Sequence, residues 1–325
     1  DEEEDEDDVK DTELRESDAL FLCATSSADL SCVEMHVYDE AGGSLYVHHD
    51  ITLPAFPLAL EWLALREESS FVAVGTFETA VEIWNLDVLD ALEPTALLRG
   101  HADAVAALCW NRLTRNTLAS GGADRTVTLW DLQAQASAAS FDAEGKVQSA
   151  KFHPTEAAAL AYGGDDRAVH LRDCRSKDAS TDFPRFNGDV ECLAWHPSNA
   201  AHLVASCDDG LVACFDVRAA QRGPCWDLGK PHASRAVPAV AFNAAGLLAT
   251  ASADKTVQLF DVRPGTADPR LAAKPMAVGK LFALAFDEGD PFLLATAGSK
   301  ATLALWDTSE NDKVAAFQRS VSSSS

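Results

Sequence analysis

Two series of aromatic residues recur along this chain of 325 residues, each at an interval of about 45 residues, and the two series stay in phase. In the first series each residue closes a strand-like segment of alternating apolar and polar residues. Its members are Tyr38, Trp84, Trp130, Arg172, Phe215, Phe260 and Trp306, with Arg172 in the place of an aromatic residue. The second series precedes the first by about 20 residues and consists of Trp62, Trp110, Phe152, Trp195, Phe242 and Phe286.

An interval of this length, with Trp-Asp endings, is typical of the four-stranded blades of WD40 propellers. The clearest copy is the segment 117–132, in which Val127 and Leu129 alternate with Thr128 as in a half-buried strand. Seven copies of the first series predict an all-β fold, a seven-bladed WD40 β-propeller. The slot residues Trp84, Trp130, Phe215, Phe260 and Trp306 should be buried on third strands.

The ends of the chain differ in composition from the repeats. The formal net charge is -25, and residues 1–8 are all acidic. We therefore expect residues 1–18 to form an acidic tail, largely disordered or extended, residues 19–319 to form the propeller, and residues 320–325 to form a disordered Ser-rich tail. The first blade should hold a hairpin over 20–38 and a strand over 44–51. Its innermost strand must come from the polar residues 9–18 and is expected to be short or missing.

Charge and composition also exclude several classes of function. The acidity argues against broad, non-specific contact with nucleic-acid backbones, although a local basic patch would still permit RNA binding. There is no run of about 18 apolar residues, so no transmembrane helix is expected. The eight cysteines show neither C-x-x-C pairs nor a zinc-binding spacing, and we interpret them as buried, reduced thiols of a nuclear or cytosolic protein.

A set of polar residues recurs with the repeat. His101 precedes Asp124 by 23 residues, and His232 precedes Asp254 by 22. In WD40 proteins such a pair joins a Ser or Thr and the slot Trp in a hydrogen-bonded tetrad, and the most complete set here is His101, Ser120, Asp124 and Trp130. Its repetition around the ring favours a structural role over Ser-His-Asp catalysis, because a single active site would not recur from one repeat to the next. No catalytic residue, metal or cofactor is expected.

Two further groups of residues are candidates for contacts. His48 and His49 could suggest a metal site, but adjacent residues of a strand point to opposite faces, so they should not share one ion. Basic residues recur in the turn of four blades: Arg125, Arg167 and Lys255 directly follow the turn aspartate, and Lys300 falls one position earlier in its blade, whereas the fifth blade has Gly210 at this position. They are either ordinary turn residues or, on one face of the ring, anchors for RNA phosphates or an acidic segment of a partner.

Some segments are more individual than the general repeat: 36–63, 80–94, 100–132, 146–160 and 173–176. Together they closely resemble the periodic tryptophan protein 1 family, and residues 177–310 resemble it more loosely. The resemblance implies a nucleolar WD40 protein that assists assembly of the large ribosomal subunit. Some family members carry a Lys-rich insertion where residues 94–100 are short and nearly uncharged here, so an RNA contact through that insertion does not carry over.

The resulting hypothesis is a non-catalytic protein-interaction scaffold in large-subunit biogenesis and pre-rRNA processing, located in the nucleolus or nucleus. Its expected partners are pre-60S ribosome-assembly proteins, with pre-rRNA and histones as further candidates, and neither a membrane nor a small-molecule substrate. The main alternative is a chromatin-associated reader of histone tails. A substrate receptor of a ubiquitin ligase is a third hypothesis that rests on the generic fold alone.

Overall fold

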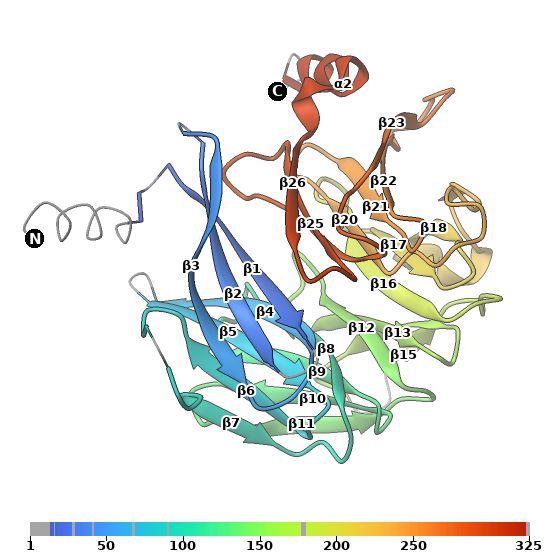
Figure 1. Ribbon diagram of the computed structural model, residues 1–325. Coiled ribbons are helices and arrows are strands. Elements are labelled where there is room, and N and C mark those ends of the chain that lie inside the picture. The colour runs from blue at the N-terminus through green and yellow to red at the C-terminus, as the bar shows by residue number, and fades with distance from the viewer. Residues whose placement is uncertain are drawn as a thin grey trace, which may run out of the picture.

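The computed structural model describes residues 14–15, 17–27, 30–40, 42–66, 69–89, 91–176 and 180–322, and its strands form seven antiparallel sheets. The sheets follow one another around a ring (Figure 1). The predicted seven-bladed β-propeller is therefore confirmed. Each sheet is one blade, numbered here in chain order.

Blades 1 to 4 contain the first fifteen strands. Blade 1 consists of β1 (Ala19–Ser26), β2 (Ser31–Asp39) and β3 (Ser44–Leu53), and blade 2 of β4 (Pro57–Arg66), β5 (Ser69–Thr76), β6 (Ala80–Asn85) and β7 (Ala96–Arg99). Blade 3 consists of β8 (Val105–Trp110), β9 (Thr117–Gly122), β10 (Thr126–Asp131) and β11 (Ala136–Asp142), and blade 4 of β12 (Val147–Phe152), β13 (Ala159–Gly164), β14 (Val169–Asp173) and β15 (Ser180–Asp182).

Blades 5 to 7 contain the remaining strands and the helices. Blade 5 consists of β16 (Val190–Trp195), β17 (His202–Cys207), β18 (Val212–Asp216) and β19 (Trp226–Asp227), with the 3₁₀ segment η1 (Val217–Arg222) between the last two. Blade 6 consists of β20 (Ala239–Phe242), β21 (Leu247–Ala251), β22 (Thr256–Asp261) and β23 (Arg270–Pro275). Blade 7 consists of β24 (Leu281–Phe286), β25 (Leu293–Gly298) and β26 (Leu303–Asp307), followed by η2 (Thr308–Glu310) and α2 (Asp312–Ser322).

The first strands of blades 2 to 7 line the inside of the ring, and in blades 2 to 6 each contacts the first strand of the next blade. Small residues on the second strands allow neighbouring blades to approach closely. A Cβ atom at Gly121 of β9 would collide with Val147 of the next blade. The apolar, small-residue character of the second strands therefore follows from packing between blades.

The third strands hold the slot residues. Trp84, Trp130, Phe215, Phe260 and Trp306 are all buried on third strands, as predicted. In blade 4 the guanidinium carbon of Arg172 lies 4.0 Å from the centroid of the Phe141 ring. A cation–π contact thus fills the one third-strand slot where an aromatic residue is replaced by arginine.

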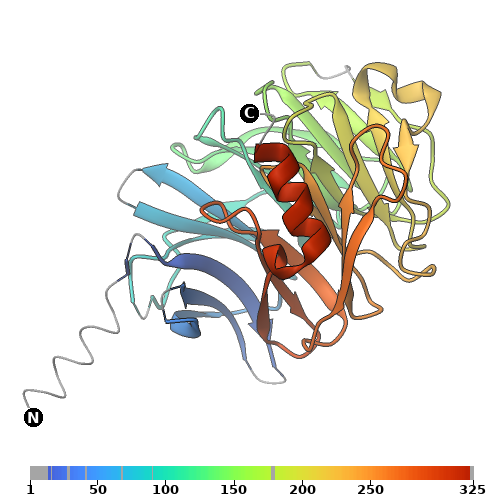
Figure 2. The same ribbon diagram turned by 90° about the horizontal axis from the view of Figure 1, so that it is seen from above.

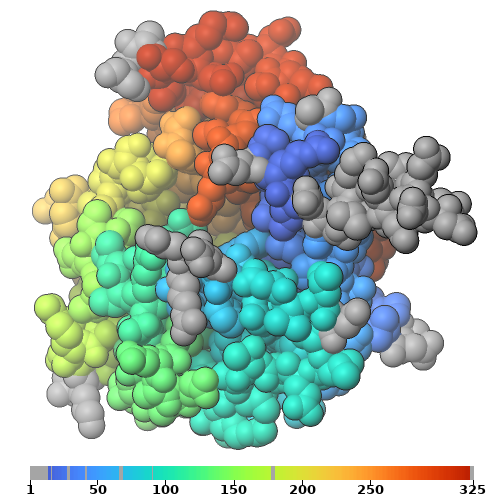
Figure 3. Space-filling view, turned by 90° about the vertical axis from the view of Figure 1, so that its left-hand side faces the viewer, coloured from blue at the N-terminus to red at the C-terminus, as the bar shows by residue number. Residues whose placement is uncertain are grey.

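The ring closes between blade 7 and blade 1, each of which has three strands among the described residues. Phe21 of β1 is buried in one cluster with Leu293 and Ala295 of β25. In the space-filling view the orange and red of the last blade lie against the blue of the first (Figure 3). The innermost strand expected from residues 9–18 falls mostly outside the described residues, and residues 14, 15, 17 and 18 are not in a strand.

The chain continues after the last blade into the helix α2. Val314 and Phe317 are buried against blades 6 and 7, with Val321 packed at the edge of the same cluster. Figure 2 shows α2 beside the orange strands of these blades. None of the helices described is long and apolar enough to cross a lipid bilayer.

The prediction of a disordered Ser-rich tail from residue 320 is wrong for residues 320–322, which belong to α2. The hydroxyl of Ser320 donates to the Phe317 carbonyl at 2.6 Å, and that of Ser322 donates to the Gln318 carbonyl at 3.0 Å. Docking of the apolar side of α2 outweighs the weak helix preference of serine. Residues 323–325 lie outside the described residues.

Candidate functional site

In blades 2 to 7 the turns between the second and the third strands lie on one face of the propeller, which we call the turn face. The residue after the turn aspartate has a positive φ in three blades: 63° at Arg125, 63° at Arg167 and 75° at Lys255. In blade 5 the equivalent residue is Gly210, with φ of 90°, and in blade 7 it is Ala301, with φ of 52°. The same left-handed turn is thus repeated around the ring.

The structure places the four basic residues Arg125, Arg167, Lys255 and Lys300 on the turn face, with exposed side chains. Within the described parts of the chain none of the four takes part in an ion pair, so their charged groups are available to a partner. In blade 5 the position is uncharged, and the neighbouring Asp209 pairs with Lys230 at 2.9 Å. The basic residues therefore form an arc that blade 5 interrupts.

The tetrad residues lie beneath this face in blade 3. His101 Nδ1 lies 2.9 Å from Asp124 Oδ2, and His101 Nε2 lies 2.6 Å from Ser120 Oγ. Trp130 Nε1 donates to the same Ser120 Oγ at 2.7 Å. The assignment that satisfies every group has His101 donating to Asp124 and accepting from Ser120.

Asp124 also bonds to the backbone. It accepts from the N–H groups of Ala102 at 2.8 Å and Thr126 at 3.0 Å, and from the Thr126 hydroxyl at 2.8 Å. Burial alone would raise the pKa of Asp124, but the bonds from Ala102, Thr126 and His101 outweigh it and lower that pKa below its ordinary value. The network joins the connection between blades 2 and 3 to the turn between β9 and β10.

The same network prevents Ser120 from acting as a nucleophile. Its side chain is fully buried, and its hydroxyl contacts both His101 and the indole of Trp130. No substrate can reach a hydroxyl in this position. The arrangement has the residues and the order of hydrogen bonds of a catalytic triad, but burial of the serine and its bond from the indole fit a structural role.

Blades 4 and 6 contain variants of this hydrogen-bonded network. In blade 6, His232 lies 2.8 Å from both Asp254 and Thr250, with Phe260 in place of the indole donor. In blade 4 the histidine is instead His170 on the third strand, which bridges Asp166 and Asp182. The turn aspartate thus keeps a histidine partner in three blades, although the histidine comes from different positions.

The expected separation of His48 and His49 is wrong. The register between β2 and β3 shifts between Met35 and His36, which inserts His48 as an extra residue of β3. Because of this bulge the Nδ1 atoms of His48 and His49 lie 2.8 Å apart. Strict alternation of side chains fails where a bulge interrupts the strand.

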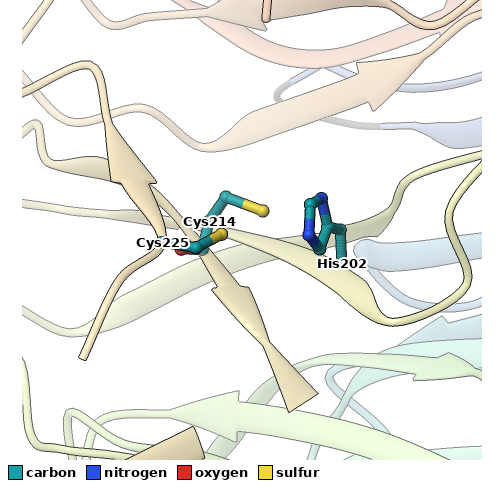
Figure 4. A group of neighbouring side chains, drawn as sticks. All are labelled: His202, Cys214 and Cys225. Atoms are coloured by element: carbon teal, nitrogen blue, oxygen red, sulfur yellow. The ribbon is translucent and has the colours of Figure 1, made fainter. Parts of the chain in front are cut away.

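His202, Cys214 and Cys225 lie together in blade 5, although their spacing along the chain matches no metal-binding motif. Figure 4 shows both sulfur atoms on the side of Cys214 and Cys225 that faces the imidazole. Strand pairing creates this proximity. The sequence alone does not indicate this group, because His202 and Cys214 come to lie on one face only through the register of β17 with β18.

Comparison with known proteins gives consistent similarities. Residues 92–131, 181–216 and 226–261 match the family described as WD domain, G-beta repeat. Over 91% of its length the chain is 32% identical to Periodic tryptophan protein 1 homolog of Drosophila melanogaster, and covers 69% of that protein. It is 29% identical to Periodic tryptophan protein 1 of Saccharomyces cerevisiae over 92% of the chain and 64% of that protein. A third similarity, 33% identity over 37% of the chain and 28% of that protein, is to Ribosome biogenesis protein WDR12 homolog of Chlamydomonas reinhardtii.

Proposed function

Because this chain belongs to the periodic tryptophan protein 1 family of WD40-repeat proteins, we propose that it is a non-catalytic scaffold for assembly of the large ribosomal subunit. The observation that carries this proposal is the similarity over nine tenths of the chain to the two periodic tryptophan proteins. The match to a protein named for ribosome biogenesis supports the same process. The proposed place of action is the nucleolus, and the proposed process includes pre-rRNA processing.

The proposed mechanism is steric and multivalent. Seven blades form one ring whose loops present several separate contact points, so weak individual contacts add up when they are used together. The burial of Ser120 supports a scaffold over a hydrolase, because the one Ser-His-Asp set of blade 3 serves packing.

The turn face is the proposed docking surface. Arg125, Arg167, Lys255 and Lys300 offer exposed cations on an otherwise acidic chain, which suits acidic segments of pre-60S assembly proteins or phosphates of pre-rRNA. Since each exposed ion pair contributes only about 0.2–1 kcal/mol, the arc would act as a set.

Affinity purification of the tagged protein, followed by analysis of the bound RNA and proteins, tests the proposal. Large-subunit precursors with their rRNA are the expected partners. Recovery of nucleosomes without these precursors would instead support the histone-tail reader, and recovery of cullin adaptors would support the ligase receptor. Depletion of the protein should lower mature large-subunit rRNA while sparing the small subunit, and normal large-subunit processing after depletion would contradict the proposal.

A further inference from the structure

Three side chains able to bind a soft metal ion meet at the outer part of blade 5. They are His202 at the start of β17, Cys214 on β18, and Cys225 immediately before β19. The nearest ligand atoms of the three residues all lie within 4.8 Å of one another (Figure 4). Among the residues that the structure describes, this is the one such group of three histidine, cysteine or acidic side chains.

The register of the blade explains why they meet. Cys214 is paired with Val204, which is two residues beyond His202, so Cys214 and His202 lie on the same face of the sheet. The backbone N–H of Cys225 donates to the Cys214 carbonyl at 2.8 Å, and its thiol lies 3.3 Å from the same oxygen. The group is therefore fixed by the backbone of three adjacent segments.

The set of donor atoms suits zinc. Zinc binds thiolate sulfur at about 2.3 Å and imidazole nitrogen at about 2.0–2.1 Å, so the ligands of a tetrahedral ion lie roughly 3.5–3.8 Å apart. Closing the group by roughly 1 Å, through side-chain rotation, reaches this geometry. Two sulfur ligands and one nitrogen ligand also disfavour the oxygen-seeking ions Mg²⁺ and Ca²⁺.

The three side chains are available for such a role. The imidazole of His202 makes no hydrogen bond to other side chains in the described part of the chain, and contacts His196 edge to face with ring centroids 6.2 Å apart. The Cys214 thiol is buried, and its contact with the Phe215 carbonyl is long, at 4.0 Å.

A groove gives access to the group. It has a volume of about 580 Å³, lies between the outer parts of blades 5 and 6, and is lined by residues that include His196, His202, Cys225, Trp226 and Arg263. Cys225 is exposed. An ion held by the three residues would therefore turn its fourth position to the groove, where water or a donor atom of a partner can bind it.

We propose that His202, Cys214 and Cys225 bind one Zn²⁺ ion, whose fourth position faces the groove between blades 5 and 6. The site ties the short outer strand β19 to β17 and β18. It is independent of the proposed role in ribosome assembly, because it can be measured on the purified chain alone.

Titration of the reduced, chelator-treated chain with Co²⁺ under anaerobic conditions tests the site. The expected result is one equivalent of Co²⁺ with a thiolate-to-metal charge-transfer band and the strong visible bands of a four-coordinate ion, both removed by Zn²⁺. Cys225→Ala is the main variant, because Cys225 is exposed and its truncation leaves the core intact. His202→Gln removes the nitrogen ligand. Each should weaken Co²⁺ binding by more than about 10-fold, since even outer-shell changes at metal sites cost about 10–100-fold.

Cys192→Ala is the matched control. Cys192 lies on β16 of the same blade, and its sulfur contacts the Leu193 and Val240 carbonyls rather than the three ligands. This variant should bind Co²⁺ as the parent chain does, and far-ultraviolet circular dichroism should show all variants folded. Absence of the charge-transfer band in the parent chain, an unchanged band in folded Cys225→Ala, or equal loss in Cys192→Ala would each overturn the proposal.

Discussion

The Nδ1 atom of His101 lies 2.9 Å from the Oδ2 atom of Asp124, although 23 positions separate the two residues along the chain. This bond attaches the connection that enters blade 3 to the turn between its second and third strands. Asp124 is the centre of the attachment, because it also accepts two backbone N–H groups and a hydroxyl.

Asp124→Ala should therefore lower the free energy of unfolding by about 1–3 kcal/mol, the usual cost of leaving buried partners unpaired. Urea denaturation of the purified variant measures the loss. Asp142→Ala is a suitable control, because Asp142 is an exposed residue of β11 in the same blade. An unchanged transition in Asp124→Ala, with loss of partner binding, would show that Asp124 is a contact residue instead.

His170 should make a pH-dependent contribution to stability. Burial alone would lower its pKa, but the bonds to Asp166 and Asp182 outweigh burial and raise it. A raised pKa means that the contribution is complete below the ordinary histidine value of about 6.5, and is lost as the pH rises through the folded-state value. His170→Gln should thus cost more stability at about pH 5.5 than at about pH 8.

The contribution of His232 to stability should depend on pH in the opposite direction. Burial is the main cause of its lowered pKa, and it outweighs the effect of Asp254. Its contribution is complete above the ordinary histidine value and is lost as the pH falls through the lowered value, so His232→Gln should cost more at about pH 8 than at about pH 5.5. Denaturation of both variants at the two pH values measures the difference. Equal pH dependence of the two variants would contradict both assignments.

Reversing the charges of the turn face should weaken association with large-subunit precursors. The variant replaces Arg125, Arg167, Lys255 and Lys300 by Glu, and the binding that remains should be less sensitive to salt. The melting temperature should change little, because all four side chains are exposed. Co-purification of precursor rRNA at two salt concentrations measures the effect.

The control for this variant carries the same change of charge elsewhere. Exposed arginines at the opposite face and on α2 are replaced by Glu: Arg115, Arg222, Arg270 and Arg319. This control should retain association. Equal weakening by both sets would show that total charge, and not the arc, governs binding. Parent-like binding by the folded turn-face variant would show that the four basic residues are ordinary turn residues.

Phe317→Ala should release α2 from the propeller without unfolding the blades. Phe317 is buried, and the Arg263 guanidinium carbon lies 4.6 Å from the centroid of its ring. Because the helix can detach by itself, the loss is limited to its docking energy and appears as faster amide exchange over Asp312–Ser322. Gln318→Ala, on the partly exposed side, serves as the control. Unchanged exchange in Phe317→Ala would contradict the docking.

The fold could be predicted from the sequence because the same packing arrangement recurs in every blade. Residues such as Trp130 and Trp306 occupy equivalent buried positions in their blades. The sequence pattern therefore occurs seven times, and it stays recognisable although Arg172 departs from it. The tetrad residues were identifiable for the same reason, since His101 and His232 keep nearly the same distance from their aspartates.

Features that occur once were harder to predict. The bulge that brings His48 and His49 together has no glycine or proline to mark it. Serine-rich composition indicated disorder at the end of the chain, although Val314, Phe317 and Val321 follow the spacing of an amphipathic helix. The cluster of His202 with its two cysteines depends on strand register, which spacing along the chain does not encode.

The seam between blades 1 and 7 has a thermodynamic consequence. Among the described residues no strand pairs across it, and the two blades meet through side chains such as those of Phe21 and Leu293. Opening of the ring at this boundary breaks apolar contacts but no backbone hydrogen bonds between paired strands. It therefore requires less free energy than separation of strands within a blade. A ligand that bridges the two blades would therefore bind the closed ring selectively, and would raise its stability in proportion to the logarithm of the ligand concentration.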